Sequence, residues 1–487
     1  MRRASLVTSV VFASAAIASI AAIVACGSAT ISPFDSDAAT GGGASSEGGA
    51  GSSGGFGERG GGEGGMTAGC TGLQCQQHTC GGGATTTVSG VVYDPAGKNP
   101  LYNVVVYVPN SPVQPLPVGA TCDACNSLYT GNPIATALTD AAGKFTLTNV
   151  PDGKDIPLVI QIGKWRRQIT LSSVMQCQDN PQPDKSLRLP KNTQEGDIPN
   201  IAISTGGSDS LECLLTRIGL DATEYRGGAG GAGHLHIFAG GQGGIFGGGA
   251  PNTSPPGPAS STGLWSSNAE LSKYDIVLLS CEGQETSSMN QQAMVDYAAA
   301  GGRVFASHFH YSWFNSGPYG SDNLASWSSG TNDIGDITSS IVTTLPSGAP
   351  FPKGLALQQW LTNVNALSGG KLAISQARHN ADVAAVNTAS QPWIKAESKS
   401  PGATEYFTFN TPVGVPAANQ CGRVVYSDLH VGAASGDYQN LSTTVPSGCG
   451  TGDLSPQEKA LEFMLFDLSS CVTPDSQPPA PPPGGVK

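Results

Sequence analysis

The pattern of hydrophobic and polar positions divides the chain into three regions. A continuous apolar run, "LVTSVVFASAAIASIAAIVA", follows Arg2 and Arg3. From about Thr85 to Ser173, short runs alternate between apolar and polar positions and are separated by the turn sequences "DAAG" and "PDGKD", which is typical of β-strands. From about Ile198 onward, short apolar runs alternate with amphipathic helical patterns. We therefore expect an all-β sandwich followed by an α/β three-layer domain with a parallel sheet.

The α/β region contains several segments with clear local signals. "YDIVLLSCEG" is a continuous apolar run, as expected of a central parallel strand buried on both faces. "SMNQQAMVDYAAAGG" predicts a helix that ends at Gly301–Gly302, and "RVFASHFH" predicts the next strand. "ATEYR" is an earlier predicted strand, and Ser208 or Asp209 is the predicted N-cap of the helix before it. "LSPQEKALEFMLFDLSSC" carries a capping box from Ser455 to Glu458.

The remaining segments have too few core-forming residues to fold by themselves. Residues 1–25 are a predicted signal peptide, 26–69 a Gly/Ser-rich tether and 472–487 a Pro-rich tail. The predicted domains are then 70–180, the sandwich, and 195–471, the α/β domain. Within the second domain, residues 227–262 are a predicted Gly-rich insertion.

Charge and cysteine content narrow the possible partners and the compartment. Only 12% of residues are charged and the net charge is −12, which argues against a nucleic-acid partner. Eleven cysteines follow Cys26, and so many in an exported chain predict disulfides with at least one thiol left over. We expect the first six to belong to the sandwich and the last five to the α/β domain. Zinc binding by "CTGLQCQQHTC" and "CDAC", with His78 nearby, is the alternative.

The end of the apolar run, "IVAC", resembles the lipobox of bacterial lipoproteins. The resemblance implies cleavage before Cys26, acylation of that residue, and a membrane partner through the lipid anchor. Gly27, in place of an Asp, favours sorting to the outer membrane. An ordinary secretory signal or an uncleaved anchor helix is the alternative.

The sandwich region resembles the carboxypeptidase regulatory-like domain, which is a transthyretin-like fold. The segments that carry this resemblance are "VSGVVYDPAGKNPLYNVVVYV" and "TDAAGKFTLTNVPDG". Such domains are not themselves catalytic. The zinc-peptidase spacings H-x-x-E and H-E-x-x-H do not occur in the chain, so the resemblance implies no peptidase.

The second domain resembles the class I glutamine amidotransferase-like superfamily, and in particular its trehalose-utilisation-type branch. Three segments carry the resemblance in order: "YDIVLLSCEG", "MVDYAAAGGRVFASHFH" and "GRVVYSDLHVG". It implies a flavodoxin-like sheet. Where amidotransferases hold the nucleophilic Cys, this chain has Ser307, His308 and Phe309, so we expect no glutaminase activity. Cys281 lies at the end of a different strand, and we do not expect it to be the nucleophile.

The candidate site lies at the carboxyl ends of the parallel strands, where open α/β sheets bind ligands. We expect His308 and His310 to share one face of a strand and, with Asp428 or His430, to ligate a divalent metal such as Zn²⁺. A metal-free ligand pocket and a purely structural role for the histidines are the alternatives. Candidates for catalytic chemistry are Cys281, Glu282, His308 and Asp428. A second H-x-H, His234 and His236, lies in the Gly-rich segment.

Two functions fit these observations. The favoured one is a non-catalytic binding or scaffolding role at the cell envelope, with a carbohydrate or an envelope protein as ligand. The alternative is a metal-dependent hydrolase that uses the four proposed metal ligands. Metal analysis of the purified protein separates the two.

Overall fold

The computed structural model describes residues 69–122, 127–240, 259–431 and 445–482. All of them belong to one compact unit. The predicted signal peptide, Cys26 and the tether before Gly69 lie outside the described residues. No described helix is both long enough and apolar enough to cross a membrane.

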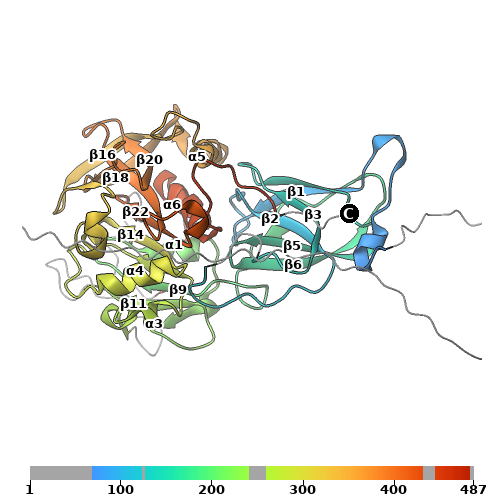
Figure 1. Ribbon diagram of the computed structural model, residues 1–487, viewed down its shortest axis with the longest axis horizontal. Coiled ribbons are helices and arrows are strands. Elements are labelled where there is room, and N and C mark those ends of the chain that lie inside the picture. The colour runs from blue at the N-terminus through green and yellow to red at the C-terminus, as the bar shows by residue number, and fades with distance from the viewer. Residues whose placement is uncertain (1–68, 123–126, 241–258, 432–444, 483–487) are drawn as a thin grey trace, which may run out of the picture. The chain divides into compact units, whose positions relative to one another are not determined.

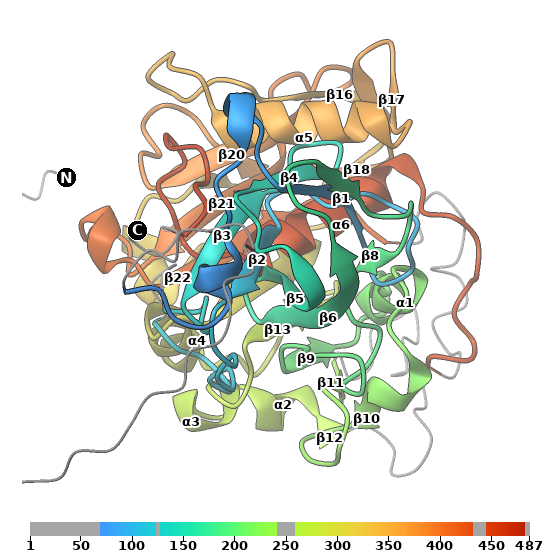
Figure 2. The same cartoon turned by 90° about the vertical axis from the view of Figure 1, so that its right-hand side faces the viewer.

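The first domain consists of two four-stranded sheets, as the alternating pattern predicts (Figures 1 and 2). One has the order β4-β1-β7, with β8 also paired to β1, and the other has the order β3-β2-β5-β6. The strands are β1 (Thr87–Tyr93), β2 (Val105–Pro109), β3 (Pro133–Leu138), β4 (Lys144–Thr148), β5 (Gly153–Ile162), β6 (Trp165–Val174), β7 (Asp179–Pro181) and β8 (Leu187–Arg188). Because β8 pairs with β1, the domain extends beyond the predicted boundary at residue 180.

The second domain is built on a twelve-stranded sheet of described strands with the order β10-β11-β9-β13-β14-β22-β21-β20-β16-β18-β17, and β12 pairs with β11. The strands from β10 to β22 in this order are parallel, and the later ones are antiparallel, so the sheet is mixed and not purely parallel. The parallel part comprises β9 (Ile201–Ser204), β10 (Tyr225–Gly227), β11 (Leu235–Ala239), β12 (Ala259–Ser260), β13 (Ile276–Leu279), β14 (Arg303–Ser307) and β22 (Gly422–Ser427).

The antiparallel extension arises from the middle of the domain, where the sequence pattern is least regular. It comprises β16 (Asp333–Ile341), β17 (Leu367–Ser368), β18 (Lys371–Arg378), β20 (Ser390–Ala396) and β21 (Thr404–Thr411), while β15 (Ser326–Trp327) and β19 (Ala381–Asp382) form a separate pair.

Helices pack against both faces of the parallel part, which gives three layers. In β13, Ile276 and Leu278 join the core that includes α1 (Leu211–Arg217), α5 (Pro352–Asn363) and α6 (Pro456–Ser469). Val277 and Leu279 join the core that includes α2 (Ser261–Leu264), α3 (Asn268–Leu271) and α4 (Gln291–Ala299). Successive side chains of a strand point to opposite faces of the sheet, so β13 contributes residues to both cores.

The helices predicted at α1, α4 and α6 are all present, and only the predicted N-cap of α1 is wrong. The capping box of α6 is present, with the Ser455 hydroxyl accepting from the Glu458 amide and the Glu458 carboxylate accepting from the Ser455 amide. Gly301, with a φ of 114°, ends α4. The N-cap of α1 is Ser210, not Ser208 or Asp209, and the Asp209 Oδ1 accepts from the Val431 amide.

The predicted Gly-rich insertion 227–262 is wrong in part. Its segment Leu235–Ala239 forms β11, an almost fully buried strand between β10 and β9. These five residues have strand character, but the glycines around them make the segment resemble a loop in the sequence. The strand forms because it pairs in parallel with β10 on one side and β9 on the other. Residues 241–258 lie outside the described part. Of the predicted strand "ATEYR", only Tyr225 and Arg226 belong to β10.

The disulfide prediction is confirmed. The bonds are Cys70–Cys75, Cys80–Cys177, Cys122–Cys421 and Cys213–Cys449, and Cys471 is also disulfide-bonded. Cys281 is free and buried. The zinc alternative for Cys70, Cys75 and Cys80 is wrong, because all three are disulfide-bonded. The Cys122–Cys421 bond joins the sandwich to the α/β domain.

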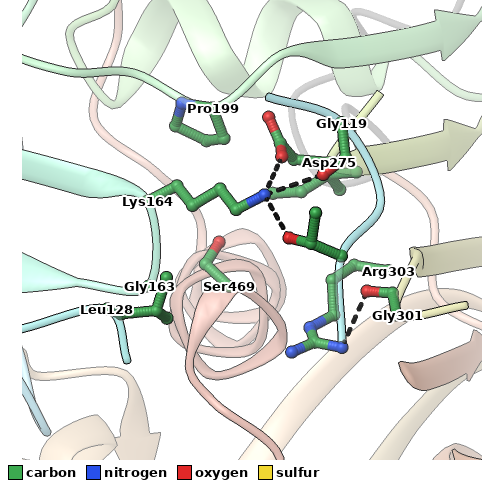
Figure 3. Close-up of a pocket in the computed structure, with 11 residues that line it drawn as sticks. Gly119, Leu128, Gly163, Lys164, Pro199, Asp275, Gly301, Arg303 and Ser469 are labelled. Carbon is green, nitrogen blue, oxygen red and sulfur yellow. Dashed lines mark hydrogen bonds and ion pairs between the residues drawn. The ribbon is translucent and has the colours of Figure 1, made fainter. Parts of the chain in front are cut away.

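Lys164 forms a second connection between the domains (Figure 3). Its ammonium group donates to the Asp275 carboxylate at 2.7 Å, to the Gly119 carbonyl at 2.7 Å and to the Thr121 hydroxyl at 2.9 Å. The surrounding cavity is only about 30 Å³, which is room for about two water molecules. Lys164 therefore occupies most of this position, and the remaining space is too small for an organic ligand.

Candidate functional site

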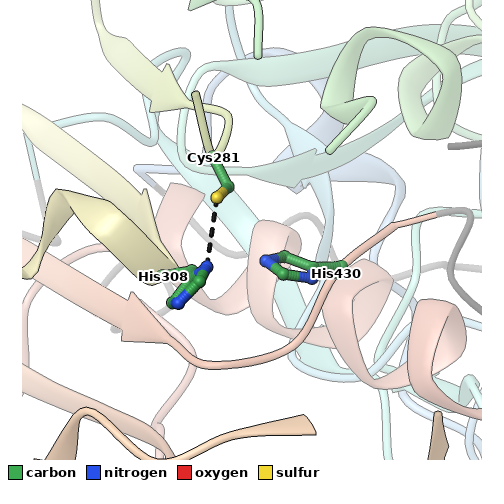
Figure 4. Close-up of side chains that lie close together, drawn as sticks. All are labelled: Cys281, His308 and His430. Atoms are coloured by element: carbon green, nitrogen blue, oxygen red, sulfur yellow. Dashed lines mark hydrogen bonds between the residues drawn. The ribbon is translucent and has the colours of Figure 1, made fainter. Parts of the chain in front are cut away.

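Strand register brings Cys281 and His308 together. Leu279 of β13 pairs with Ala306 of β14, so Cys281 and His308, each two residues further on, leave the sheet at the same level. The Cys281 Sγ and the His308 Nδ1 are 3.2 Å apart (Figure 4). The other ring nitrogen of His308, Nε2, lies 3.1 Å from the Thr331 carbonyl and must carry the proton to donate to it. The Nδ1 lone pair therefore faces the thiol.

His430 completes a group of three donors. It follows β22, the neighbour of β14, and its ring centroid is 5.1 Å from that of His308. The Cys281, His308 and His430 donor atoms lie within 4.8 Å of one another, and all three side chains are buried. The His430 Nε2 has no hydrogen-bond partner among the described residues, which is costly for a buried nitrogen. This group can hold a metal ion, which would satisfy that nitrogen.

Burial sets the protonation state of the three groups. Desolvation, with smaller contributions from His430 and Arg378 at His308 and from Arg378 at His430, lowers the pKa of His308 to about 2 and that of His430 to about 3. Desolvation also raises the pKa of the Cys281 thiol to about 12. Both imidazoles are therefore neutral, which is the form that binds metals, and the thiol keeps its proton unless a metal replaces it. The pair does not form a thiolate–imidazolium dyad.

The prediction that His310 shares a face with His308 is wrong. The strand ends at Ser307, and His308–Trp313 form a short 3₁₀-helix that begins with a φ of 45° at His308. The two rings therefore diverge. The His310 Nε2 lies 2.9 Å from the Ser280 carbonyl, and its Nδ1 accepts from the Trp313 indole N–H at 3.0 Å. With both nitrogens satisfied, His310 has a structural role.

Asp428 and Glu282 also lie outside the group of donor atoms. The Asp428 Oδ2 accepts from the Asn380 amide at 2.9 Å, and its Oδ1 lies 2.8 Å from the Tyr426 hydroxyl. Burial raises the pKa of Asp428 to about 7. The predicted metal ligation by Asp428 is therefore wrong, because its two oxygens are hydrogen-bonded to the Asn380 amide and the Tyr426 hydroxyl and lie outside the donor group. Glu282 is buried beside Cys281 in sequence without joining the three donors.

The second H-x-H does not form a metal site either. In His236 the Nδ1 lies 2.9 Å from the Tyr274 hydroxyl and the Nε2 lies 2.9 Å from the Gly233 carbonyl. His234 lies next to the Ile198 carbonyl. Both rings support β11 and its neighbours.

Sequence reasoning missed the part that Asp209 plays in this site. Its Oδ1 accepts from the backbone amide of Val431 at 2.8 Å and from that of Ser210 at 3.0 Å. The nearby Cys281 amide and Ser307 hydroxyl also favour its ionised form and oppose the effect of burial on its pKa. This carboxylate thus fixes Val431, the residue after His430, and lies close to Cys281 and to Ser307, the residue before His308. Its position after the strand–Gly–Gly turn, at the same sheet edge, was the available signal.

Comparisons with known proteins add little to this geometry. No family model and no curated protein matches the chain. Among solved structures, a type II cohesin–X-dockerin complex from Acetivibrio cellulolyticus, an N-terminal interface mutant, is 16% identical over 28% of this chain and 85% of that chain, with a TM-score of 0.16. A 9R-lipoxygenase from Cyanothece is 12% identical over 22% of this chain and 16% of that chain, with a TM-score of 0.11. Such low scores carry no argument about fold or function.

Proposed function

We propose that this protein is an exported, lipid-anchored protein of the cell envelope whose α/β domain holds a zinc ion between Cys281, His308 and His430. The observation that carries the metal assignment is the convergence of three buried donors, one of them a nitrogen without a protein partner. A thiol and two imidazoles match the ligand preference of zinc. The disulfides support an oxidising compartment, in keeping with export.

We further propose a non-catalytic binding role, with a carbohydrate as the ligand class and an envelope protein as the alternative. The class I glutamine amidotransferase-like resemblance supports the fold of this domain, and its trehalose-utilisation branch supports the ligand class. Two features argue against glutaminase activity: Cys281 is protonated and fully buried, and it follows β13 and not β14. The donors are at most 2% exposed, as in a closed structural metal site.

One observation favours the alternative, a metal-dependent hydrolase. Three protein donors leave a fourth tetrahedral position, which catalytic zinc sites use for water. The ligands of that site would be Cys281, His308 and His430, since His310 and Asp428 are engaged elsewhere.

Cobalt substitution tests the metal site. The purified chain, with its disulfides intact, is titrated with Co²⁺, and a thiolate-to-cobalt charge-transfer band is expected in the near ultraviolet. The band should be lost in Cys281→Ser and weakened in His430→Gln. The matched control is His310→Gln, which changes a buried histidine of the same edge outside the donor group and should keep the band. Circular dichroism checks that each variant is folded.

Two results would count against the proposal. An unchanged cobalt spectrum in Cys281→Ser would remove the thiol from the site. Equal loss in His310→Gln and His430→Gln, with both variants folded, would show that the effect is not specific to the donors. Zinc-dependent hydrolysis of ester or phosphate substrates, abolished in Cys281→Ser, would replace the binding role by the hydrolase.

A further inference from the structure

A second cavity, lined by other residues, has a different chemistry. Its volume is about 250 Å³, and residues of both domains line it. Four cationic side chains contribute to the lining: Lys98, Lys185, Arg217 and Lys459. The whole chain has only 24 Lys and Arg residues and a net charge of −12. One sixth of its cations thus surround one cavity in an acidic protein.

The acidic groups at this cavity do not cancel that charge. Asp453 pairs with Lys98 at 2.9 Å, and its side chain is 85% exposed, so solvent screens this pair. Asp94 is buried beside Glu462, and burial raises the pKa of both carboxyls. Two carboxyls in contact favour sharing a proton, so this pair carries less than two negative charges. Glu458 is a further counter-charge, and its Oε1 lies 2.6 Å from the Arg217 Nη1.

Several donors at the cavity are fixed in place and still have N–H groups to offer. Arg217 is held by Glu458 and by the carbonyls of Gly452 and Asp453. Lys459 donates to the Val364 carbonyl at 2.7 Å. A guanidinium has five N–H groups and an ammonium has three, so both side chains keep donors for a further acceptor. Holding these donors in place lowers the ordering cost of binding an anion.

We propose that this cavity binds a small anion through phosphate or carboxylate oxygens, with Arg217 and Lys459 as the fixed donors and Lys98 and Lys185 closing on it from the solvent side. Arg and Lys are the side chains that bind these groups most strongly. In binding, the ligand takes the place of the exposed Asp453 carboxylate at Lys98. This site is independent of the metal group, since none of the three metal donors lines it.

Calorimetric titration tests the proposal with three probes at low salt: inorganic phosphate, glucuronate and glucose. Phosphate or glucuronate should bind, the affinity should fall as salt is raised, and neutral glucose should give no heat. Whichever of the two anions binds more tightly identifies the ligand class. Lys98→Met and Lys185→Met, both at exposed positions, should each weaken binding about tenfold.

Lys273→Met is the matched control. It removes the same charge from an exposed lysine that does not line the cavity, so it should leave the affinity unchanged. The proposal is overturned if neither anion gives heat at low salt, if Lys98→Met and Lys185→Met bind as the wild type does, or if Lys273→Met weakens binding equally. The last result would indicate attraction by overall charge and not a site.

Discussion

Replacing Asp209 tests whether one carboxylate organises the proposed metal site. The side chain is fully buried, and its Oδ1 accepts from the backbone amides of Ser210 and Val431. In Asp209→Ala both amides lose this acceptor, at about 1–3 kcal/mol each. Part of this loss is offset, because burial disfavours the carboxylate and raises its pKa to about 7. We expect the free energy of unfolding to fall by roughly 2–4 kcal/mol.

The same change should weaken metal binding without touching a donor atom. The loop that carries His430 loses the group that fixes it beside Cys281, and outer-shell changes of this kind cost about 10–100-fold in metal affinity. Asp209→Asn keeps an acceptor oxygen in the same place, so it should retain most of the stability and the affinity. The measurements are urea unfolding with the disulfides intact and competition for Zn²⁺ against a chelating dye.

Asp296→Ala is the control, because Asp296 is an exposed acid on α4 and its loss should change stability by no more than about 0.5 kcal/mol. The reasoning is refuted if Asp209→Ala unfolds at the wild-type urea concentration and binds zinc as tightly. If the Asn variant loses as much affinity as the Ala variant, the charge and not the geometry of this carboxylate is what matters.

Two further predictions concern the pH dependence of stability and the membrane anchor. Burial raises the pKa of Glu212 from 4.5 to about 8, so the folded state holds its proton more tightly than the unfolded state does. As the pH rises between these two values, the free energy of unfolding of the wild type should fall relative to that of Glu212→Gln, by at most about 1.4 kcal/mol per pH unit. Urea unfolding of both proteins at pH 5 and pH 8 checks this. A pH-independent difference would contradict it. Cys26→Ser should abolish lipid labelling and release the protein from membranes; undiminished labelling would rule out the proposed anchor.

Local signals were sufficient for much of the fold. Alternating positions predicted the strands of the sandwich, and the continuous apolar run at Ile276–Leu279 predicted a strand buried on both faces. The capping box at Ser455 was readable because all of its parts lie within four residues. The strand β11 was hidden because its five residues lie among glycines, and its pairing partners are distant in sequence.

The candidate site shows the same division. The sequence by itself placed Cys281, His308 and His430 at the carboxyl ends of parallel strands, because strand direction and order follow from the alternation of strands and helices. Only the tertiary structure decided which side chains meet. The strand ends one residue before His308, and the 3₁₀-helix that follows places the His310 Nε2 beside the Ser280 carbonyl. The Asp428 carboxylate accepts a hydrogen bond from the Asn380 backbone amide.

The physical reason is that side-chain direction beyond the end of a strand depends on long-range hydrogen bonds. A period of two holds only while the backbone stays extended, and it fails at the first residue that leaves the strand. Register between β13 and β14 sets Cys281 level with His308, and the Asp209 carboxylate fixes the loop after His430. The sequence determined which chemical groups reach this edge of the sheet; packing and hydrogen bonds between distant segments determined which of them form the site.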